Sequence, residues 1–146
     1  MLSRYLSPSR VRLDVAVGSL EEAVLFCGGL LVETGCASPD YPGAMMETVR
    51  YLGDGIVMAA HTALPHAAFA RGGLQAAVAV IRLAQPIPFG GENGPVQLLF
   101  GFCGCDPDSH MAVLSALAEF LSRPDAVSSL LESRDKDSFY QLLCQS

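Results

Sequence analysis

The segment "VQLLFGFCG", residues 96–104, is apolar at almost every position, and it constrains the fold more than any other stretch of the chain. A strand with one face in water alternates apolar and polar residues, whereas a strand covered on both faces need not alternate. We therefore predict a central strand over 96–104. The segment behind it, "DPDSHMAVLSALAEFLSR", has helical periodicity, and Asp108 or Ser109 is a natural N-cap for that helix.

The other segments alternate between strand and helix patterns, which indicates an α/β fold. Strand patterns occupy 11–17, 56–60 and 74–83, and further helical patterns occupy 20–35, 39–52, 124–132 and 135–145. Ser19 and Glu22 fit a capping box, Gly35 is expected to end that helix, and Pro39 to open the next. Because no linker, repeat or low-complexity segment interrupts these patterns, we predict a single domain over residues 1–146.

Composition excludes several classes of function. Hydrophobic residues make up 51% of the chain and charged residues 16%, which is typical of a globular domain. A net charge of −6 argues against a nucleic-acid-binding surface or an anionic-membrane surface, because both need clustered Lys and Arg. The most apolar run, "AAVAVIRL", is interrupted by Arg82 and is far shorter than the roughly 20 residues of a membrane-spanning helix. We expect no membrane insertion, and a small molecule or a protein with a basic face as partner.

The cysteines and histidines give no strong metal signal. Five cysteines are an odd number in a chain whose N-terminus lacks a secretory pattern, so we expect reduced thiols and a cytoplasmic location. Cys103 and Cys105 have no second ligand pair, and His61 and His66 are not spaced like zinc ligands. Small apolar packing is the simpler interpretation of the two cysteines, and we predict no metal and no organic cofactor.

His66 and His110 are the candidate functional residues. His66 follows a predicted strand in a turn fixed by Pro65, and His110 lies in the first turn of the helix behind 96–104. If the strands 56–60 and 96–104 are neighbours that end at the same edge, the two imidazoles meet beside a helix N-terminus. Such an arrangement suits a phosphoryl group, although a single histidine in a domain of this size is more often a surface or core residue.

Most of the chain resembles a known family. "AMMETVRYLGDGIVMAAHTALPHA" (44–67), "VAVIRLAQPIPFG" and "PVQLLFGFCGCDPDSHMAVLSALAEFLSRPDAVSSLL" resemble EIIA domains of the bacterial phosphoenolpyruvate:sugar phosphotransferase system, of the mannitol/fructose structural type and most similar to ascorbate-type members. The "ALPHA" turn followed in order by "DSHMAVL" is the specific part of this resemblance. It implies a mixed β-sheet flanked by helices on both faces.

The resemblance also implies a phosphotransferase function. His66 would accept a phosphoryl group from the phosphohistidine of an HPr-like carrier protein and pass it to a cysteine of an EIIB partner, which in turn connects to a membrane EIIC; His110 would assist. A neutral imidazole is a good nucleophile at cytosolic pH, and phosphoryl transfer asks the protein mainly for positioning and charge stabilisation. The backbone N–H groups around Met111 and Ala112, together with Ser109, are candidate phosphoryl-binding groups.

Three departures from the family pattern leave alternatives open. Ala68 and Phe69 stand where family members often carry an Arg–Pro pair, so Arg71 is the candidate substitute. Family members also often carry an arginine on the second helix, and Arg50 is the nearest arginine to that position. His61 stands where glycine is usual, and we expect it to face solvent. A regulatory EIIA-like protein-interaction module outside transport is therefore the alternative to a phosphocarrier. The sequence determines neither the sugar nor the oligomeric state.

Overall fold

A five-stranded mixed sheet runs through the protein, whose computed structural model describes residues 1–145. The strands are β1 (Val11–Val15), β2 (Val57–Ala59), β3 (Thr62–Ala63), β4 (Ala77–Ile87) and β5 (Val96–Cys103), in the spatial order β1-β4-β5-β3-β2. The pairs β1–β4 and β3–β5 are parallel, and β4–β5 and β2–β3 are antiparallel. The predicted central position of the segment 96–104 is confirmed.

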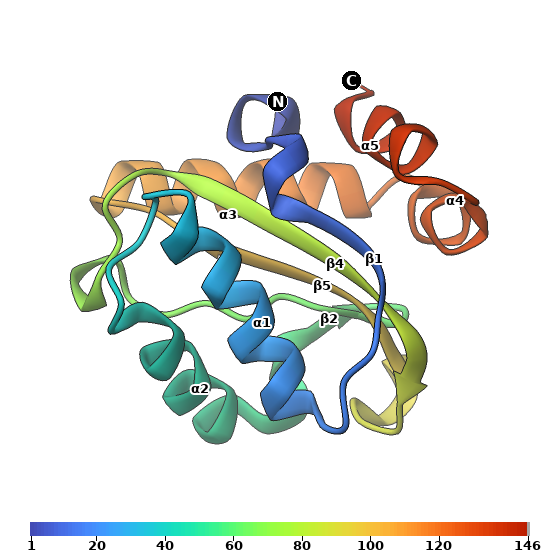
Figure 1. The fold of residues 1–146 in the computed structure, drawn as a ribbon, viewed down its shortest axis with the longest axis horizontal. Coiled ribbons are helices and arrows are strands. Elements are labelled where there is room, and N and C mark those ends of the chain that lie inside the picture. The colour runs from blue at the N-terminus through green and yellow to red at the C-terminus, as the bar shows by residue number, and fades with distance from the viewer. Residues whose placement is uncertain (146) are drawn as a thin grey trace.

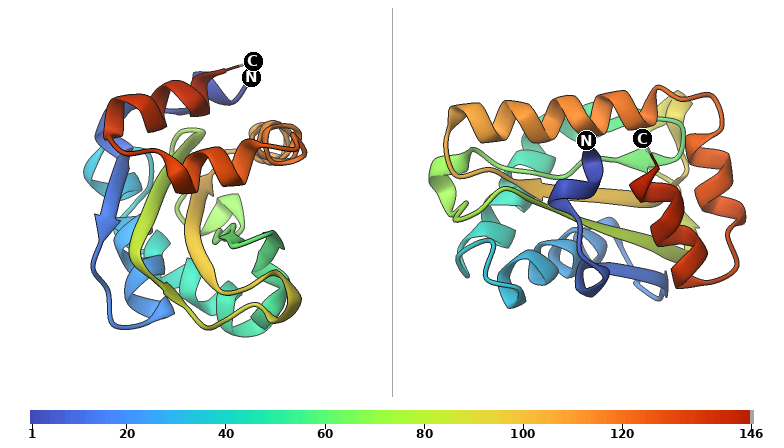
Figure 2. Two further views of the ribbon diagram at one scale, coloured as in Figure 1. Left: turned by 90° about the vertical axis from the view of Figure 1, so that its right-hand side faces the viewer. Right: turned by 90° about the horizontal axis from the view of Figure 1, so that it is seen from above.

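Helices cover both faces of the sheet, as predicted. They are α1 (Leu20–Glu33), α2 (Tyr41–Leu52), α3 (Pro107–Leu121), α4 (Ala126–Glu132) and α5 (Lys136–Cys144). Helices α1 and α2 lie on one face and α3, α4 and α5 on the other (Figures 1 and 2). Among residues 1–145, no helix is both long enough and apolar enough to cross a membrane.

The apolar character of β5 follows from this layering. Leu99 and Cys103 pack into the core beneath α1 and α2, whereas Phe100 and Phe102 pack into the core beneath α3, α4 and α5. Gly101 lets β5 pack closely against α1, because a Cβ at this position would lie 2.6 Å from the Sγ of Cys27 on α1. Every side of β5 is therefore in contact with protein, so a polar residue would be buried there at a cost.

The helix termini confirm some predictions and correct others. Ser19 caps α1 by accepting from the N–H of Glu22, and the N–H groups of Gly35 and Cys36 close a Schellman motif at its end. The second helix does not open at Pro39. It starts at Tyr41, with Pro42 in its first turn, because residues 38–41 first form a turn closed by the Tyr41 N–H and the Ser38 carbonyl.

The predicted strand 56–60 is wrong in part. The chain reverses after Ala59, so only β2 remains of it, and Met58 on this edge strand is 57% exposed. The returning strand β3 is buried and pairs with β5. His61 makes this reversal in the left-handed region at φ 58°, which explains why a glycine suits the position. The prediction that His61 faces solvent holds in part, since the residue is partly exposed while its Nδ1 lies 2.9 Å from the carbonyl oxygen of Pro95.

The reversal at His61 leads to a testable difference between two substitutions. His61→Ala removes the imidazole hydrogen bond and keeps a side chain at positive φ, so we expect a loss of about 1 kcal/mol in the free energy of unfolding. His61→Gly loses the same bond but relieves about 1 kcal/mol of backbone strain, so we expect little net change. Urea unfolding of both variants measures the difference, and equal losses would show that backbone strain at residue 61 is negligible.

Candidate functional site

His66 and His110 meet at one edge of the sheet. Because β3 and β5 are parallel, they end at the same edge, and His66 lies three residues beyond the end of β3. His110 lies in the first turns of α3, directly after β5. The two ring centroids are 5.7 Å apart at an interplanar angle of 54°. The expected meeting of the two imidazoles is therefore present, although β3 rather than the predicted strand 56–60 places His66 there.

The ring of His66 is fixed by two contacts. It stacks on Phe102, with centroids 4.5 Å apart and planes inclined by 20°, and its Nδ1 lies 2.7 Å from the carbonyl oxygen of Leu64. A carbonyl oxygen only accepts hydrogen bonds, so Nδ1 carries the proton and donates it. In the neutral ring the lone pair then resides on Nε2, which makes Nε2 the nucleophilic atom of His66.

The surroundings of His66 favour its neutral form. Burial lowers the pKa of His66 from 6.5, the hydrogen bond to Leu64 acts in the opposite direction, and the neighbouring His110 lowers the pKa further. At pH values between the lowered pKa of folded His66 and 6.5, this residue binds fewer protons in the folded protein than in the unfolded chain. The stabilisation associated with a neutral His66 is therefore complete above pH 6.5 and is lost as the pH falls towards the folded-state pKa.

This pKa shift can be measured directly. We expect the Cε1–H resonance of His66 to titrate with a midpoint below 6.5 in the folded protein, because burial penalises the imidazolium. We also expect the free energy of unfolding to decrease as the pH is lowered below about 6.5, and this part of the decrease to disappear in His66→Gln. A midpoint above 6.5 would contradict the assigned cause.

His110 differs from His66 in its ring contacts. Its Nδ1 is buried without a hydrogen-bond partner among the described residues, and its backbone N–H donates to the carbonyl of Asp106. Nδ1 of His110 is a buried unpaired donor in one tautomer and a buried unpaired acceptor in the other, and either costs about 1–3 kcal/mol. The pair thus combines a free lone pair on Nε2 of His66 with a neighbouring imidazole whose Nδ1 has no partner among the described residues.

The cap of α3 lies closer to β5 than predicted. Asp106 is the N-cap, not Asp108 or Ser109, and its Oδ1 accepts from the N–H of Ser109 at 2.7 Å. The Ser109 hydroxyl in turn accepts from the Cys105 and Asp106 N–H groups. This capping box is possible because Asp106 is extended while Pro107 already has helical geometry. The hydrogen bonds from Ser109 lower the pKa of Asp106, so the cap stays ionised.

Because α3 starts earlier than predicted, three predicted phosphoryl-binding residues lie further from its N-terminus. Ser109 is engaged in the capping box. Met111 and Ala112 are the fifth and sixth residues of α3, so their N–H groups point to carbonyls of the preceding helical turn and are not free at the terminus. The helix dipole still directs partial positive charge towards the imidazole pair.

Gly104 permits α3 to begin this close to β5. A Cβ on Gly104 would lie 2.6 Å from the backbone nitrogen of His110 and 2.7 Å from its Cα. We expect Gly104→Ala to destabilise the protein by about 1–3 kcal/mol and to shift the NMR signals of both histidines, because the start of α3 must move. Gly29→Ala in α1 is the matched control: its Cβ meets nothing within 4 Å, and a gain of about 0.5–1 kcal/mol is expected. Urea unfolding that ranks the two variants equally would contradict the close approach.

The candidate arginines lie on the α2 side. The guanidinium of Arg71 pairs with the carboxylate of Glu47 at 2.7 Å, and Arg50 pairs with Glu21 at 3.5 Å. Both arginines line one open groove together with Ser38. The contacts of Arg71 are thus with α2 rather than with either imidazole. Within residues 1–145, no three His, Cys, Asp or Glu side chains are grouped closely enough to hold a metal ion.

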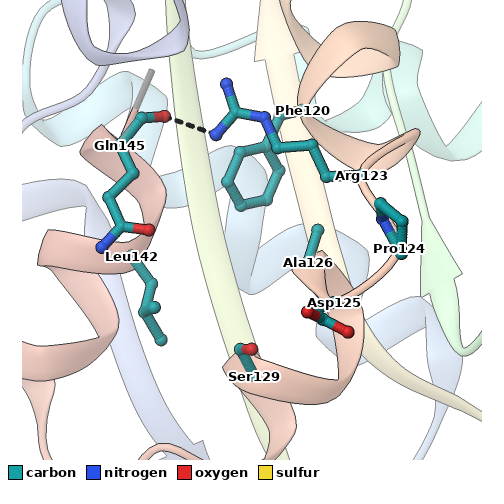
Figure 3. Close-up of a pocket in the computed structure, with 8 residues that line it drawn as sticks. All are labelled: Phe120, Arg123, Pro124, Asp125, Ala126, Ser129, Leu142 and Gln145. Atoms are coloured by element: carbon teal, nitrogen blue, oxygen red, sulfur yellow. Dashed lines mark hydrogen bonds between the residues drawn. The ribbon is translucent and has the colours of Figure 1, made fainter.

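A hollow of about 200 Å³ lies elsewhere, between the end of α3 and helices α4 and α5 (Figure 3). Its arginine, Arg123, is stacked over Phe120 and donates to the carbonyl of Gln145 at 2.7 Å. Phe120 is ten residues further along α3 than His110, or about 15 Å of helix. This hollow is therefore separate from the imidazole pair, whose two residues are partly buried.

Two contributors to the site were not predicted as such. The sequence predicts Phe102 only as part of the central strand 96–104 and Tyr41 only as part of the helix 39–52, yet Phe102 supports the His66 ring and the Tyr41 hydroxyl contacts the turn at Ala67. A signal for Tyr41 existed, because a fully buried phenol requires a hydrogen-bond partner. No sequence signal identifies that partner.

Comparison with known proteins gives a consistent family. Residues 4–146 match the family model described as phosphoenolpyruvate-dependent sugar phosphotransferase system, EIIA 2. The chain is 26% identical over 142 residues to the mannitol-specific cryptic phosphotransferase enzyme IIA component of Escherichia coli K12, covering 97% of both chains. It is 29% identical over 104 residues to the ascorbate-specific EIIA component of Salmonella choleraesuis, covering 70% of this chain and 68% of that one.

Solved structures agree. The solution structure of the same cryptic mannitol-specific protein from E. coli matches with a TM-score of 0.87 at 26% identity over 97% of both chains. The nitrogen regulatory protein IIA-Ntr of Neisseria meningitidis matches with a TM-score of 0.79 at 26% identity, covering 97% of this chain and 98% of that one. A third match has the same fold at 22% identity and a TM-score of 0.82, covering 94% and 96% of the two chains: the mannitol enzyme IIA of E. coli in complex with its phosphorylated enzyme IIB.

Proposed function

The chain belongs to the EIIA 2 family of the phosphoenolpyruvate-dependent sugar phosphotransferase system, and we propose that it carries the phosphoryl group on Nε2 of His66. The observation that carries this proposal is the hydrogen bond from Nδ1 of His66 to the Leu64 carbonyl. It leaves Nε2 as the one nucleophilic atom of a ring that burial keeps neutral. The neighbouring His110 supplies a hydrogen-bond donor.

The transfer needs no group beyond the two proteins. The lone pair on Nε2 of His66 attacks the phosphorus of a phosphohistidine on an HPr-like carrier, and the bond between phosphorus and the donor nitrogen breaks with its electron pair returning to the donor imidazole. The proton on Nδ1 remains hydrogen-bonded to Leu64. The protonated ring therefore keeps a positive charge next to the anionic phosphoryl group, and His110 donates its Nε2–H to a phosphoryl oxygen.

The onward step reverses the roles. We propose that a cysteine thiolate of an EIIB partner attacks the phosphorus, so a bond from sulfur to phosphorus forms while the bond to His66 Nε2 breaks. The mannitol enzyme IIA has the same fold as this chain, and its complex with phosphorylated enzyme IIB supports a partner of this kind. Such partners act in the cytoplasm, where the EIIB protein in turn serves a membrane EIIC. Met111 is exposed beside His110 and offers an apolar contact for docking.

A regulatory role is the second candidate. The likeness to the nitrogen regulatory protein IIA-Ntr, at nearly full coverage, favours it. Transport requires both acceptance of the phosphoryl group and its delivery to a cysteine, whereas a regulatory module binds another protein either according to its phosphorylation state or without phosphorylation. Transfer to EIIB partners therefore separates the two.

The test is an intact-mass measurement after incubation with phosphoenolpyruvate, enzyme I and HPr. We expect the mass of one phosphoryl group to be added, stable in base and labile in acid, and to be lost when a cognate EIIB is mixed in. If no mass is gained while a known EIIA is phosphorylated in the same mixture, the carrier proposal is wrong. A stable phosphorylated form that no EIIB discharges would favour regulation.

A further inference from the structure

Tyr41, the first residue of α2, reaches the histidine site from the opposite face of the sheet. Its side chain is fully buried, and its hydroxyl oxygen lies 3.1 Å from the backbone nitrogen of Ala67, 3.1 Å from the Ala67 carbonyl oxygen and 2.8 Å from the Phe102 carbonyl oxygen. One hydroxyl thus bridges the turn that carries His66 and the end of β5.

The donors and acceptors of this bridge are well defined. A phenol has one proton, and the shorter distance directs it mainly to the Phe102 carbonyl, while the oxygen accepts from the Ala67 N–H. Burial raises the pKa of Tyr41 well above its ordinary value, so the hydroxyl keeps its proton throughout the physiological range. Removal of the oxygen would leave the N–H of Ala67, which is itself buried, without this partner.

Both bridged residues determine where the His66 ring lies. Ala67 follows His66 in the chain, and the ring of Phe102 is the surface on which the His66 ring stacks. Tyr41 is itself anchored, because its backbone N–H donates to the Ser38 carbonyl and the Ser38 N–H donates to the Gly72 carbonyl beyond the turn. The path from Gly72 through Ser38 and Tyr41 to Ala67 closes a loop with residues 67–72, the segment that directly follows His66.

We infer that Tyr41 is a positioning residue: its hydroxyl holds the His66 turn against Phe102 and so fixes the ring in the orientation that presents Nε2. The effect on the reaction rests on the proposed function of His66, whereas the effect on the ring does not. Phosphoryl transfer depends on alignment of the reacting atoms, so a small gain in freedom of the turn reduces the rate without removing the nucleophile.

The test is Tyr41→Phe, which removes only the hydroxyl, with Phe139→Leu as a control that destabilises the opposite core. We expect Tyr41→Phe to accept the phosphoryl group about tenfold more slowly, to the same final extent and still on His66, and Phe139→Leu to react at the wild-type rate. In ¹⁵N NMR we expect the Nδ1–H tautomer of His66 to lose population in Tyr41→Phe only.

The outcomes separate the two proposals. An unchanged rate and an unchanged tautomer in Tyr41→Phe would overturn the positioning role, as would an equal slowing of both variants, which indicates stability alone. If even the wild-type protein accepts no phosphoryl group, the function proposed for His66 fails. The tautomer population then still decides whether Tyr41 positions the ring.

Discussion

Replacement of His66 by glutamine is expected to abolish phosphoryl acceptance, with a loss of at least about a thousandfold in rate. Glutamine keeps a polar side chain in the turn but has no nucleophilic lone pair comparable to that of Nε2. The contacts described place no other nucleophilic group next to His110. The measurement is the initial rate of phosphorylation by phospho-HPr, followed by intact mass.

His61→Gly is the matched control for this variant. It also removes an imidazole, but His61 lies at the start of β3, where it hydrogen-bonds to Pro95, and not at the end that carries His66. We expect the wild-type rate. Phosphorylation of His66→Gln at a measurable rate, or loss of phosphorylation in His61→Gly, would show that His66 is not the acceptor.

Replacement of His110 is expected to have the second largest effect. Loss of one preorganised donor to a developing oxyanion typically costs about 10²–10³ in rate, so we expect His110→Phe to be phosphorylated about a hundredfold more slowly. Phenylalanine fills the same space against Phe102, which limits the effect on packing. The final extent of phosphorylation is expected to be unchanged, because the acceptor atom remains.

His110→Gln distinguishes donation from packing. Its amide N–H can replace the Nε2–H of the imidazole in part, so we expect a rate between those of His110→Phe and the wild type. If His110→Phe reacts as fast as the wild-type protein, the donor role proposed for His110 is wrong.

Much of the fold could be predicted because its signals are local and strong. The uninterrupted apolar run 96–104 has one simple explanation, a strand in contact with protein on both faces, and β5 occupies that position. The Ser19 cap and the Gly35 termination are each set by residues within a few positions of one another. The meeting of His66 and His110 was predictable in outcome, because parallel strands end at one edge.

The parts that could not be predicted depend on contacts between distant segments. β3 has only two residues, too few for a periodic pattern, and its pairing with β5 defines it. The hydrogen bond of His61 to Pro95 is not predictable from the sequence because its two residues lie more than thirty positions apart. The N-cap of α3 lies two or three residues before the predicted Asp108 or Ser109, since Asp106 and Asp108 are equivalent candidates until Gly104 fixes the approach of the helix.

The pairing of Arg71 with Glu47 is another contact of this kind. The sequence places Arg71 near His66, but the direction of its side chain depends on α2. The hydroxyl of Tyr41 reaches Ala67 across 26 positions of sequence. Burial and periodicity indicate that a residue lies inside the core, whereas the partner of a buried polar atom depends on the assembled fold.

The most direct test of the central claim is ¹H–¹⁵N NMR of the phosphorylated protein labelled at the histidine ring nitrogens. We predict one phosphoryl group on Nε2 of His66, with the proton on Nδ1 retained by the hydrogen bond to Leu64. A phosphoryl group on Nδ1 of His66, or on His61 or His110, would contradict it, because the tautomer from which the nucleophile is assigned would then be wrong.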